Sequence, residues 1–230
     1  MANDNLSDQV YRALKREILT SALAPGNHVA EAALARRFGV SRTPVREALK
    51  RLMQDGFIRP VPGVGYDIAP ITFRDLQEVF SLRIVLEGEA TALATTQIST
   101  GDLDALEALL SELKPADLTN GAEAVCLDYI TANQRFHLTI ARASGHARLY
   151  RLIANLIEEA DRFTYLETRV VGTQGVEESL RVVAAMRARD AERARACMQD
   201  HIQGTRQRTL QAILSGAIPG VVLDRSPLGG

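Results

Sequence analysis

Apolar residues recur at helical spacing in three short segments near the start of the chain. Over residues 9–20 one helix face collects Val10, Leu14, Ile18 and Leu19. A second helix is expected over residues 31–38, ending at Gly39, because glycine readily takes the left-handed conformation at a helix C-terminus. A third begins near Ser41, where Ser41 or Thr43 can cap it, and ends at Gly56. Its inward stripe holds Val45, Ala48, Leu49, Leu52 and Met53.

Two alternating runs follow the third helix and predict a β-hairpin. They cover residues 57–61 and 66–71, and the segment Pro62-Gly63-Val64-Gly65 between them supplies a glycine-rich turn. Helix, helix, turn, helix and hairpin is the order of a winged helix-turn-helix, whose last helix enters the DNA major groove. We therefore expect a DNA-binding domain over residues 1–71.

From Thr72 onward the pattern is helical. Helical spacing covers residues 72–97 and recurs over residues 100–114, 122–143, 146–168, 175–189 and 190–215, with glycine or proline at most of the breaks. These segments predict an all-α bundle of six to seven helices over residues 72–215. Residues 216–230, rich in glycine and proline, are expected to form a mobile tail. The fold class is therefore mainly α, a winged helix followed by a helical bundle.

Charge is divided unequally between these two regions. Residues 1–72 carry ten Lys or Arg against seven Asp or Glu, whereas the remainder carries 17 against 21. A basic module joined to an acidic one indicates that only the first binds a polyanion. Cys126 and Cys197 lack the spacing of a disulfide framework or zinc finger, and no signal peptide or membrane span is readable. We expect a cytoplasmic protein without a membrane partner.

Basic side chains follow one face of the third helix. Arg46 and Lys50 lie four residues apart, and Arg42 lies at the helix start. A charged face of this kind can be a merely solvated one, but the order of elements around it favours DNA contact.

The segment GVSRTPVREAL, followed by a leucine, a Gly-aromatic pair and a glycine-containing wing, resembles the DNA-binding domain of GntR-type bacterial transcription regulators. The resemblance implies that Ser41, Arg42, Thr43 and Arg46 contact bases and phosphates, and that Gly63 approaches the minor groove. Ala32 stands where family members often carry a further DNA-contacting arginine.

Three later segments, LRIVLEGEATALA, NQRFHLTIARASGHARL and AAMRARDAERARACMQDHI, resemble the helical ligand-binding (FCD) domain of the FadR subfamily. In that subfamily one Asp and three His commonly hold a divalent metal, which shares a cavity with a small carboxylate effector. By position, His137 and His201 match the first and last histidines. Asn133 stands at the Asp position and Ser179 at the middle histidine.

These two replacements weaken the metal site, because an amide carries no charge and a hydroxyl is a poorer donor than imidazole. We therefore expect no required cofactor, with a divalent metal on His137, His201 and Asn133 as the alternative, aided by Glu177 or Glu178. The cavity can instead bind an organic effector through hydrogen-bonding and charged side chains, namely Arg83, Asn133, His137, Ser179 and His201. For Arg83 the alternative is an exposed pair with Glu87, four residues later.

The leading hypothesis is a homodimeric regulator that binds an inverted-repeat operator and responds to a small-molecule effector. One alternative is a constitutive DNA-binding regulator with a degenerate effector site. A metal-dependent enzyme is the other, but neither an HExxH nor a GxSxG motif is present, so no enzyme activity is expected.

Overall fold

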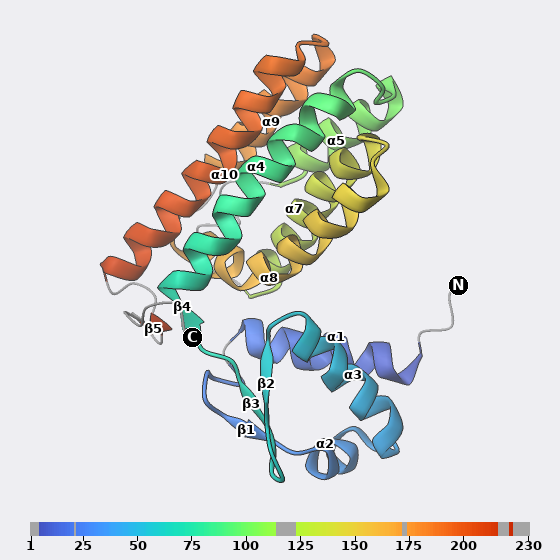
Figure 1. Ribbon diagram of the computed structural model, residues 1–230, viewed down its shortest axis with the longest axis vertical. Helices are drawn as coiled ribbons and strands as arrows, with labels where there is room; N and C mark the ends of the chain where they lie inside the picture. The colour runs from blue at the N-terminus through green and yellow to red at the C-terminus, as the bar shows by residue number, and fades with distance from the viewer. Residues whose placement is uncertain (1–4, 21, 114–122, 172–173, 216–220, 223–230) are drawn as a thin grey trace. The chain divides into compact units, whose positions relative to one another are not determined.

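A computed structural model of the chain describes residues 5–20, 22–113, 123–171, 174–215 and 221–222. It divides between Thr72 and Phe73 into two compact units. Figure 1 shows a smaller unit of helices with a short sheet and a larger unit made of helices. The expected fold class, a winged helix-turn-helix followed by a helical bundle, is confirmed.

The N-terminal unit contains three helices and a three-stranded antiparallel sheet. The helices are α1 (Leu6–Leu19), α2 (Glu31–Phe38) and α3 (Arg42–Gln54). The strands β1 (His28–Val29), β2 (Ile58–Val61) and β3 (Gly65–Ile68) lie in the order β1-β3-β2. The hairpin of β2 and β3 was expected from the sequence. The two-residue strand β1 was not, because it is too short to show an alternating pattern.

The core of this unit lies where α1 packs on α3 and α3 packs on β2. Its side chains are buried, and they include Leu14, Leu49, Leu52, Phe57 and Ile58. Met53, expected in the inward stripe, is 38% exposed and does not belong to it. Gly39 takes the expected left-handed conformation at the end of α2, with φ +65°. Ser41 occupies the N-cap of α3, but its hydroxyl makes no capping hydrogen bond there.

Glycine is required at the tip of the hairpin. Gly63 has φ +75° and open space around it. Gly65 has φ +151°, and a Cβ atom at this position would lie 2.5 Å from the backbone oxygen of Val29. The close approach of β1 to β3 therefore depends on Gly65 having no side chain.

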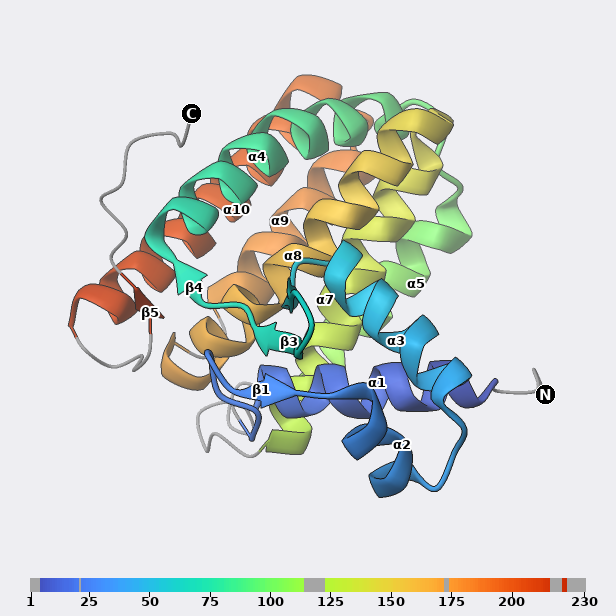
Figure 2. The same cartoon turned by 60° about the horizontal axis from the view of Figure 1, so that its bottom comes forward.

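Within its described residues the second unit contains six helices, the lower of the two numbers expected. They are α4 (Phe73–Thr95), α5 (Thr100–Ser111), α7 (Glu123–Ala143), α8 (Ala147–Val171), α9 (Gln174–Arg187) and α10 (Ala191–Leu214). Helices α4 and α10 run side by side, and α4 also packs on α7 and α8 (Figures 1 and 2). Helix α9 packs on α10, and α5 packs on α9. None of the described helices combines the length and apolar character needed to cross a bilayer.

One short parallel pair departs from the expectation that strands end before Thr72. Strand β4 (Ile71–Thr72) pairs with β5 (Val221–Val222), so part of the expected mobile tail forms a strand. Because β5 has only two residues, no sequence pattern could have indicated it. Residues 216–220 and 223–230, the rest of that tail, lie outside the described residues.

Candidate functional site

The six residues proposed to contact DNA all lie on the N-terminal unit. Five are exposed on α3 or at its N-cap, namely Ser41, Arg42, Thr43, Arg46 and Lys50. Gly63 is exposed in the turn between β2 and β3. A helix N-terminus with polar and basic side chains can present them to base edges and phosphates, and a glycine tip allows close approach to a groove.

Arg46 is held by a neighbouring carboxylate. Its Nε donates to both oxygens of Glu31 at 3.2 and 3.3 Å, and its Nη2 donates to Oε2 at 3.0 Å. This hydrogen-bonded carboxylate raises the pKa of Arg46 above its usual value. The pair links α2 to α3 and fixes the guanidinium on the exposed side of α3.

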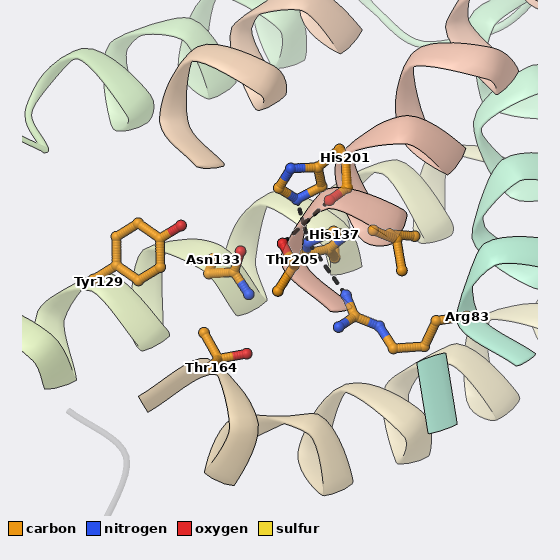
Figure 3. A pocket seen from close by; sticks show the side chains of 8 residues that line it. Arg83, Tyr129, Asn133, His137, Thr164, His201 and Thr205 are labelled. Carbon is orange, nitrogen blue, oxygen red and sulfur yellow. Dashed lines mark hydrogen bonds between the residues drawn. The ribbon is translucent and has the colours of Figure 1, made fainter. Parts of the chain in front are cut away.

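A small cavity lies among four helices of the bundle (Figure 3). Its lining comes from α4, α7, α8 and α10, and consists of Arg83, Tyr129, Asn133, His137, Thr164, His201, Ile202 and Thr205. The free space inside is about 10 Å³, enough for about one water molecule. A larger ligand must therefore displace side chains as it enters.

A buried network begins at Arg83 on α4. Its Nε donates to Glu87 Oε1 at 2.6 Å, and Glu87 Oε2 lies 2.5 Å from His137 Nδ1. All three side chains are at most 3% exposed. Burial alone would raise the pKa of Glu87, but the charge of Arg83 and the contact with His137 outweigh it and lower that pKa to about 2. Burial lowers the pKa of His137 to about 4, so this imidazole is neutral near pH 7.

The tautomer of His137 follows from these contacts. A neutral imidazole has one N–H, and here it lies on Nδ1, because Nε2 faces a guanidinium that can only donate. The lone pair of Nε2 then faces Arg83 Nη2, 3.3 Å away, which donates to it. The close contact of Nδ1 with Glu87 Oε2 does not have the geometry of a hydrogen bond, and neither atom has another hydrogen-bond partner among the described residues.

A second network approaches His137 from α9 and α10. His201 Nε2 lies 3.4 Å from His137 Nε2, and the two rings stack with their centroids 5.3 Å apart. His201 Nδ1 lies 3.2 Å from Glu178 Oε2. Arg208 forms two hydrogen bonds to Glu178, at 2.8 and 3.0 Å, and these together with the His201 contact lower the pKa of Glu178 to about 2 against its partial burial.

Both ionised carboxylates therefore face the arginines and histidines, and neither lines the cavity. The lining offers the amide of Asn133 and the guanidinium of Arg83 as donors, together with the Nε2 edges of two histidines. The hydroxyls of Thr164 and Thr205 donate to backbone oxygens four residues earlier in their own helices. Such a site favours a ligand that carries hydrogen-bond acceptors, in particular an anion.

Comparison with known proteins identifies the two units. The model for bacterial regulatory proteins of the gntR family matches residues 6–68, and the FCD domain model matches residues 78–204. The chain belongs to the gntR family and carries an FCD domain.

The relatives of this gntR-family chain bear similar descriptions. Over 207 residues it is 30% identical to the HTH-type transcriptional regulator McbR of Escherichia coli K12, which covers 88% of this chain and 92% of McbR. It is 34% identical over 148 residues to YdhC of Bacillus subtilis, an uncharacterised HTH-type transcriptional regulator, covering 64% of this chain and 65% of YdhC. The solved structure of E. coli McbR/YncC superposes with a TM-score of 0.74 at 28% identity, over 91% of this chain and 99% of McbR/YncC. The chain is therefore a transcription regulator by family, and such regulators are not enzymes.

Four of the five predicted effector residues of this gntR-family chain meet at the cavity, namely Arg83, Asn133, His137 and His201. Ser179 does not line it, and its hydroxyl donates to the backbone oxygen of Gly175 at 2.9 Å. Arg83 does pair with Glu87, the alternative given for it, but the pair is buried rather than exposed.

Several residues of the site were not predicted. Tyr129 and Thr205 lie four residues from Asn133 and His201, on the same helix faces, so helical spacing could have indicated them. Arg208 lies seven residues after His201, so helical spacing could have indicated it as well. Thr164 on α8 has no such neighbour, and no sequence signal points to it. Glu178 was named as a residue that could aid a metal site. It contacts His201, but at Nδ1, on the ring edge away from His137.

Proposed function

We propose that this regulator binds operator DNA through α3 and the wing, and that a small organic anion in the FCD cavity changes its affinity for that DNA. One observation carries the proposal. The same chain presents an exposed basic helix N-terminus and a buried cavity. Among the residues that the structure describes, the lining of this cavity holds a guanidinium and an amide but no carboxylate. The site of action we propose is the cytoplasm, where bacterial DNA is found.

On the DNA side, Arg42, Arg46 and Lys50 supply positive charge for phosphates and for guanine edges. Ser41 and Thr43 supply hydroxyls at the helix start, where the N-terminus of a recognition helix meets bases. Gly63 at the wing tip allows backbone approach to the minor groove.

On the effector side, Arg83 is the group that selects for an anion. Its Nε and Nη2 are engaged by Glu87 and His137, whereas Nη1 makes no hydrogen bond to any other residue that the structure describes. A ligand carboxylate can accept from Nη1, while the side-chain amide of Asn133 can donate to its other oxygen. The effector class we propose is therefore a small carboxylate.

We also propose that the regulator is a homodimer on an inverted-repeat operator, because two-fold protein symmetry matches two-fold DNA sites. Helix α4 supports a protein interface, since Leu82 is 52% and Val85 63% exposed on it. Sedimentation of the wild-type and Val85→Glu proteins tests this. We expect a dimer that the substitution weakens, and a wild-type monomer at micromolar concentration would contradict the proposal.

The function is tested in two steps. A thermal-shift screen of small carboxylates identifies ligands that stabilise the wild-type protein, since a ligand that binds only the folded state raises its melting temperature. An operator selected from random DNA is then titrated by fluorescence anisotropy with and without the best ligand. We expect a change in affinity of roughly 5- to 150-fold.

Two controls separate the parts of this proposal. Arg42→Ala with Arg46→Ala must abolish specific DNA binding but leave the thermal shift intact. Arg83→Gln must remove the thermal shift. A protein that binds its operator and responds to no ligand in the screen would instead be a constitutive regulator.

A further inference from the structure

The cavity keeps half of an arrangement suited to a metal ion. His137 and His201 turn their Nε2 atoms toward one another at 3.4 Å. Two imidazole nitrogens bound to one zinc at about 2.05 Å and a tetrahedral angle lie about 3.3 Å apart. The Nδ1 atoms of both rings face carboxylates, Glu87 and Glu178, which is how proteins orient histidine ligands of metals.

The remaining surroundings do not fit a metal. Among the described residues no group of three or more His, Cys, Asp and Glu side chains is placed to hold one. Asn133 offers an uncharged amide, and the hydroxyl of Ser179 is bonded within its own helix. The two arginines of the networks already balance their two carboxylates. Among the described residues, a divalent cation would therefore find no carboxylate in this buried site that is not already paired with an arginine.

A guanidinium also stands beside the position a metal would need. Arg83 Nη2 lies 3.3 Å from His137 Nε2 and donates to its lone pair. The same lone pair would have to bind the metal, and the two cations would lie within a few ångström in a buried site, where like charges repel strongly. Figure 3 shows this contact and the one between the two histidines converging on His137.

We propose that Arg83 replaces the metal ion in this cavity. Its guanidinium is a fixed cation that occupies the His137 lone pair, excludes divalent metals and binds the effector carboxylate directly. Glu87 and His137 keep it in place from Nε and Nη2 and leave Nη1 for the ligand. The part of the inference that concerns the effector rests on the function proposed above, whereas the exclusion of metal does not.

The exclusion of metal can be measured on the full-length chain. The wild-type protein is treated with a chelator, dialysed and titrated with Zn²⁺ or Ni²⁺ alone by calorimetry, with the bound metal counted by mass spectrometry. We expect it to retain no more metal than a His137→Ala/His201→Ala control. One ion per wild-type chain that this control lacks would overturn the proposal.

Two further variants show whether Arg83 is the cause. Asn133→Asp, which restores a carboxylate but keeps Arg83, is expected to bind no more metal than the wild-type. Arg83→Gln with Asn133→Asp is expected to bind one ion per chain, to lose it on His201→Ala, and to melt at a higher temperature with metal than without. One ion bound by Asn133→Asp alone, or none by the folded double variant, would contradict the role of Arg83.

Removing Arg83 leaves Glu87 with one partner fewer and can prevent folding. In that case the titrations of the wild-type and Asn133→Asp proteins still test whether the cavity excludes metal, since both proteins keep Arg83. None of these measurements involves DNA or an effector, so their failure would leave the proposed regulation untouched.

Discussion

Arg46 reaches the surface of α3 already bound to a carboxylate, and this bears on the DNA contact proposed for it. A free arginine on an exposed helix samples many rotamers and loses that freedom on binding. The hydrogen bonds from Nε and Nη2 to Glu31 hold its guanidinium in one orientation and leave Nη1 without a bond to another described residue. Glu31 is thus a positioning residue for Arg46, at the cost of a negative charge close to the DNA.

Glu31→Gln is expected to weaken discrimination rather than overall affinity. Non-specific DNA binding should rise slightly, because one negative charge is removed, while the ratio of operator to non-specific affinity should fall several-fold. Anisotropy titrations with operator and scrambled duplexes measure both quantities. Glu47→Gln removes an exposed negative charge from α3, the helix that carries Arg46, and is the matched control. An unchanged affinity ratio in Glu31→Gln would rule out the positioning role.

The buried pair of Glu87 and His137 makes the stability of the bundle depend on pH. In the folded protein the pKa of His137 is lowered to about 4, against 6.5 for a free histidine. The unfolded chain therefore binds more protons between these values, and stability present above pH 6.5 is lost as the pH falls toward 4. For Glu87, with a pKa lowered to about 2, the corresponding loss begins only below about pH 4.5.

We expect this histidine to contribute up to about 3 kcal/mol of the stability lost between pH 6.5 and 4. His137→Asn keeps an N–H near the position of Nδ1 but cannot titrate, so its free energy of unfolding should be lower at pH 7 and vary less with pH. Urea unfolding at several pH values measures this difference. His28→Gln, which removes an exposed histidine of the other unit, is the control for the loss of an imidazole. A His137→Asn profile parallel to that of the wild-type would contradict the assignment.

Single residues also show how far the site could be predicted. The resemblance to the FCD domain led us to expect Asn133, His137 and His201 at the cavity, and helical spacing placed Asn133 on the same face as His137. The burial of Arg83 and Glu87 could not be predicted, because the sequence spacing of an i,i+4 pair is the same on an exposed and on a buried helix face. The partnership of Glu178 with His201 and Arg208 depends on how α9 and α10 pack, which no local pattern encodes.

At the scale of elements, helices were predicted better than strands. Long helices repeat their apolar spacing over several turns, so α4, α8 and α10 could be located from the sequence. Strands β1 and β5 have two residues each, and both pair with segments distant in the sequence. Their existence depends on tertiary pairing, as the unpredicted contact of Val29 with Gly65 illustrates.

The wing offers a direct test of that contact. Gly65→Ala should destabilise the N-terminal unit by more than about 2 kcal/mol, because the new Cβ meets a backbone oxygen and the φ of +151° is strained for alanine. Gly63→Ala, with φ +75° but open space, should cost only about 1 kcal/mol. Thermal unfolding of the two variants gives the comparison. Equal losses would show that the approach of β1 to β3 does not depend on Gly65.

At the scale of the whole molecule, the ligands proposed for the two units are both anions, but the two sites differ in how they hold positive charge. The N-terminal region carries an excess of basic residues and exposes them on α3, as suits a polyanion whose binding weakens with salt. The remainder is net acidic and keeps its guanidinium buried among hydrogen-bond donors, as suits one small anion. Because the two sites use separate residues, each can be disabled without removing the other.

This separation allows the proposed regulation to be tested as a thermodynamic cycle. If the effector changes operator affinity by a given factor, bound operator must change effector affinity by the same factor, roughly 5- to 150-fold for a coupling of about 1–3 kcal/mol. Calorimetry with and without saturating operator measures the affinity for the effector. Anisotropy with and without effector measures the affinity for the operator. Arg42→Ala with Arg46→Ala should bind the effector as the free wild-type does, whether or not operator is added. Effector affinity that is unchanged by operator in the wild-type would mean that the cavity binds its ligand without controlling DNA.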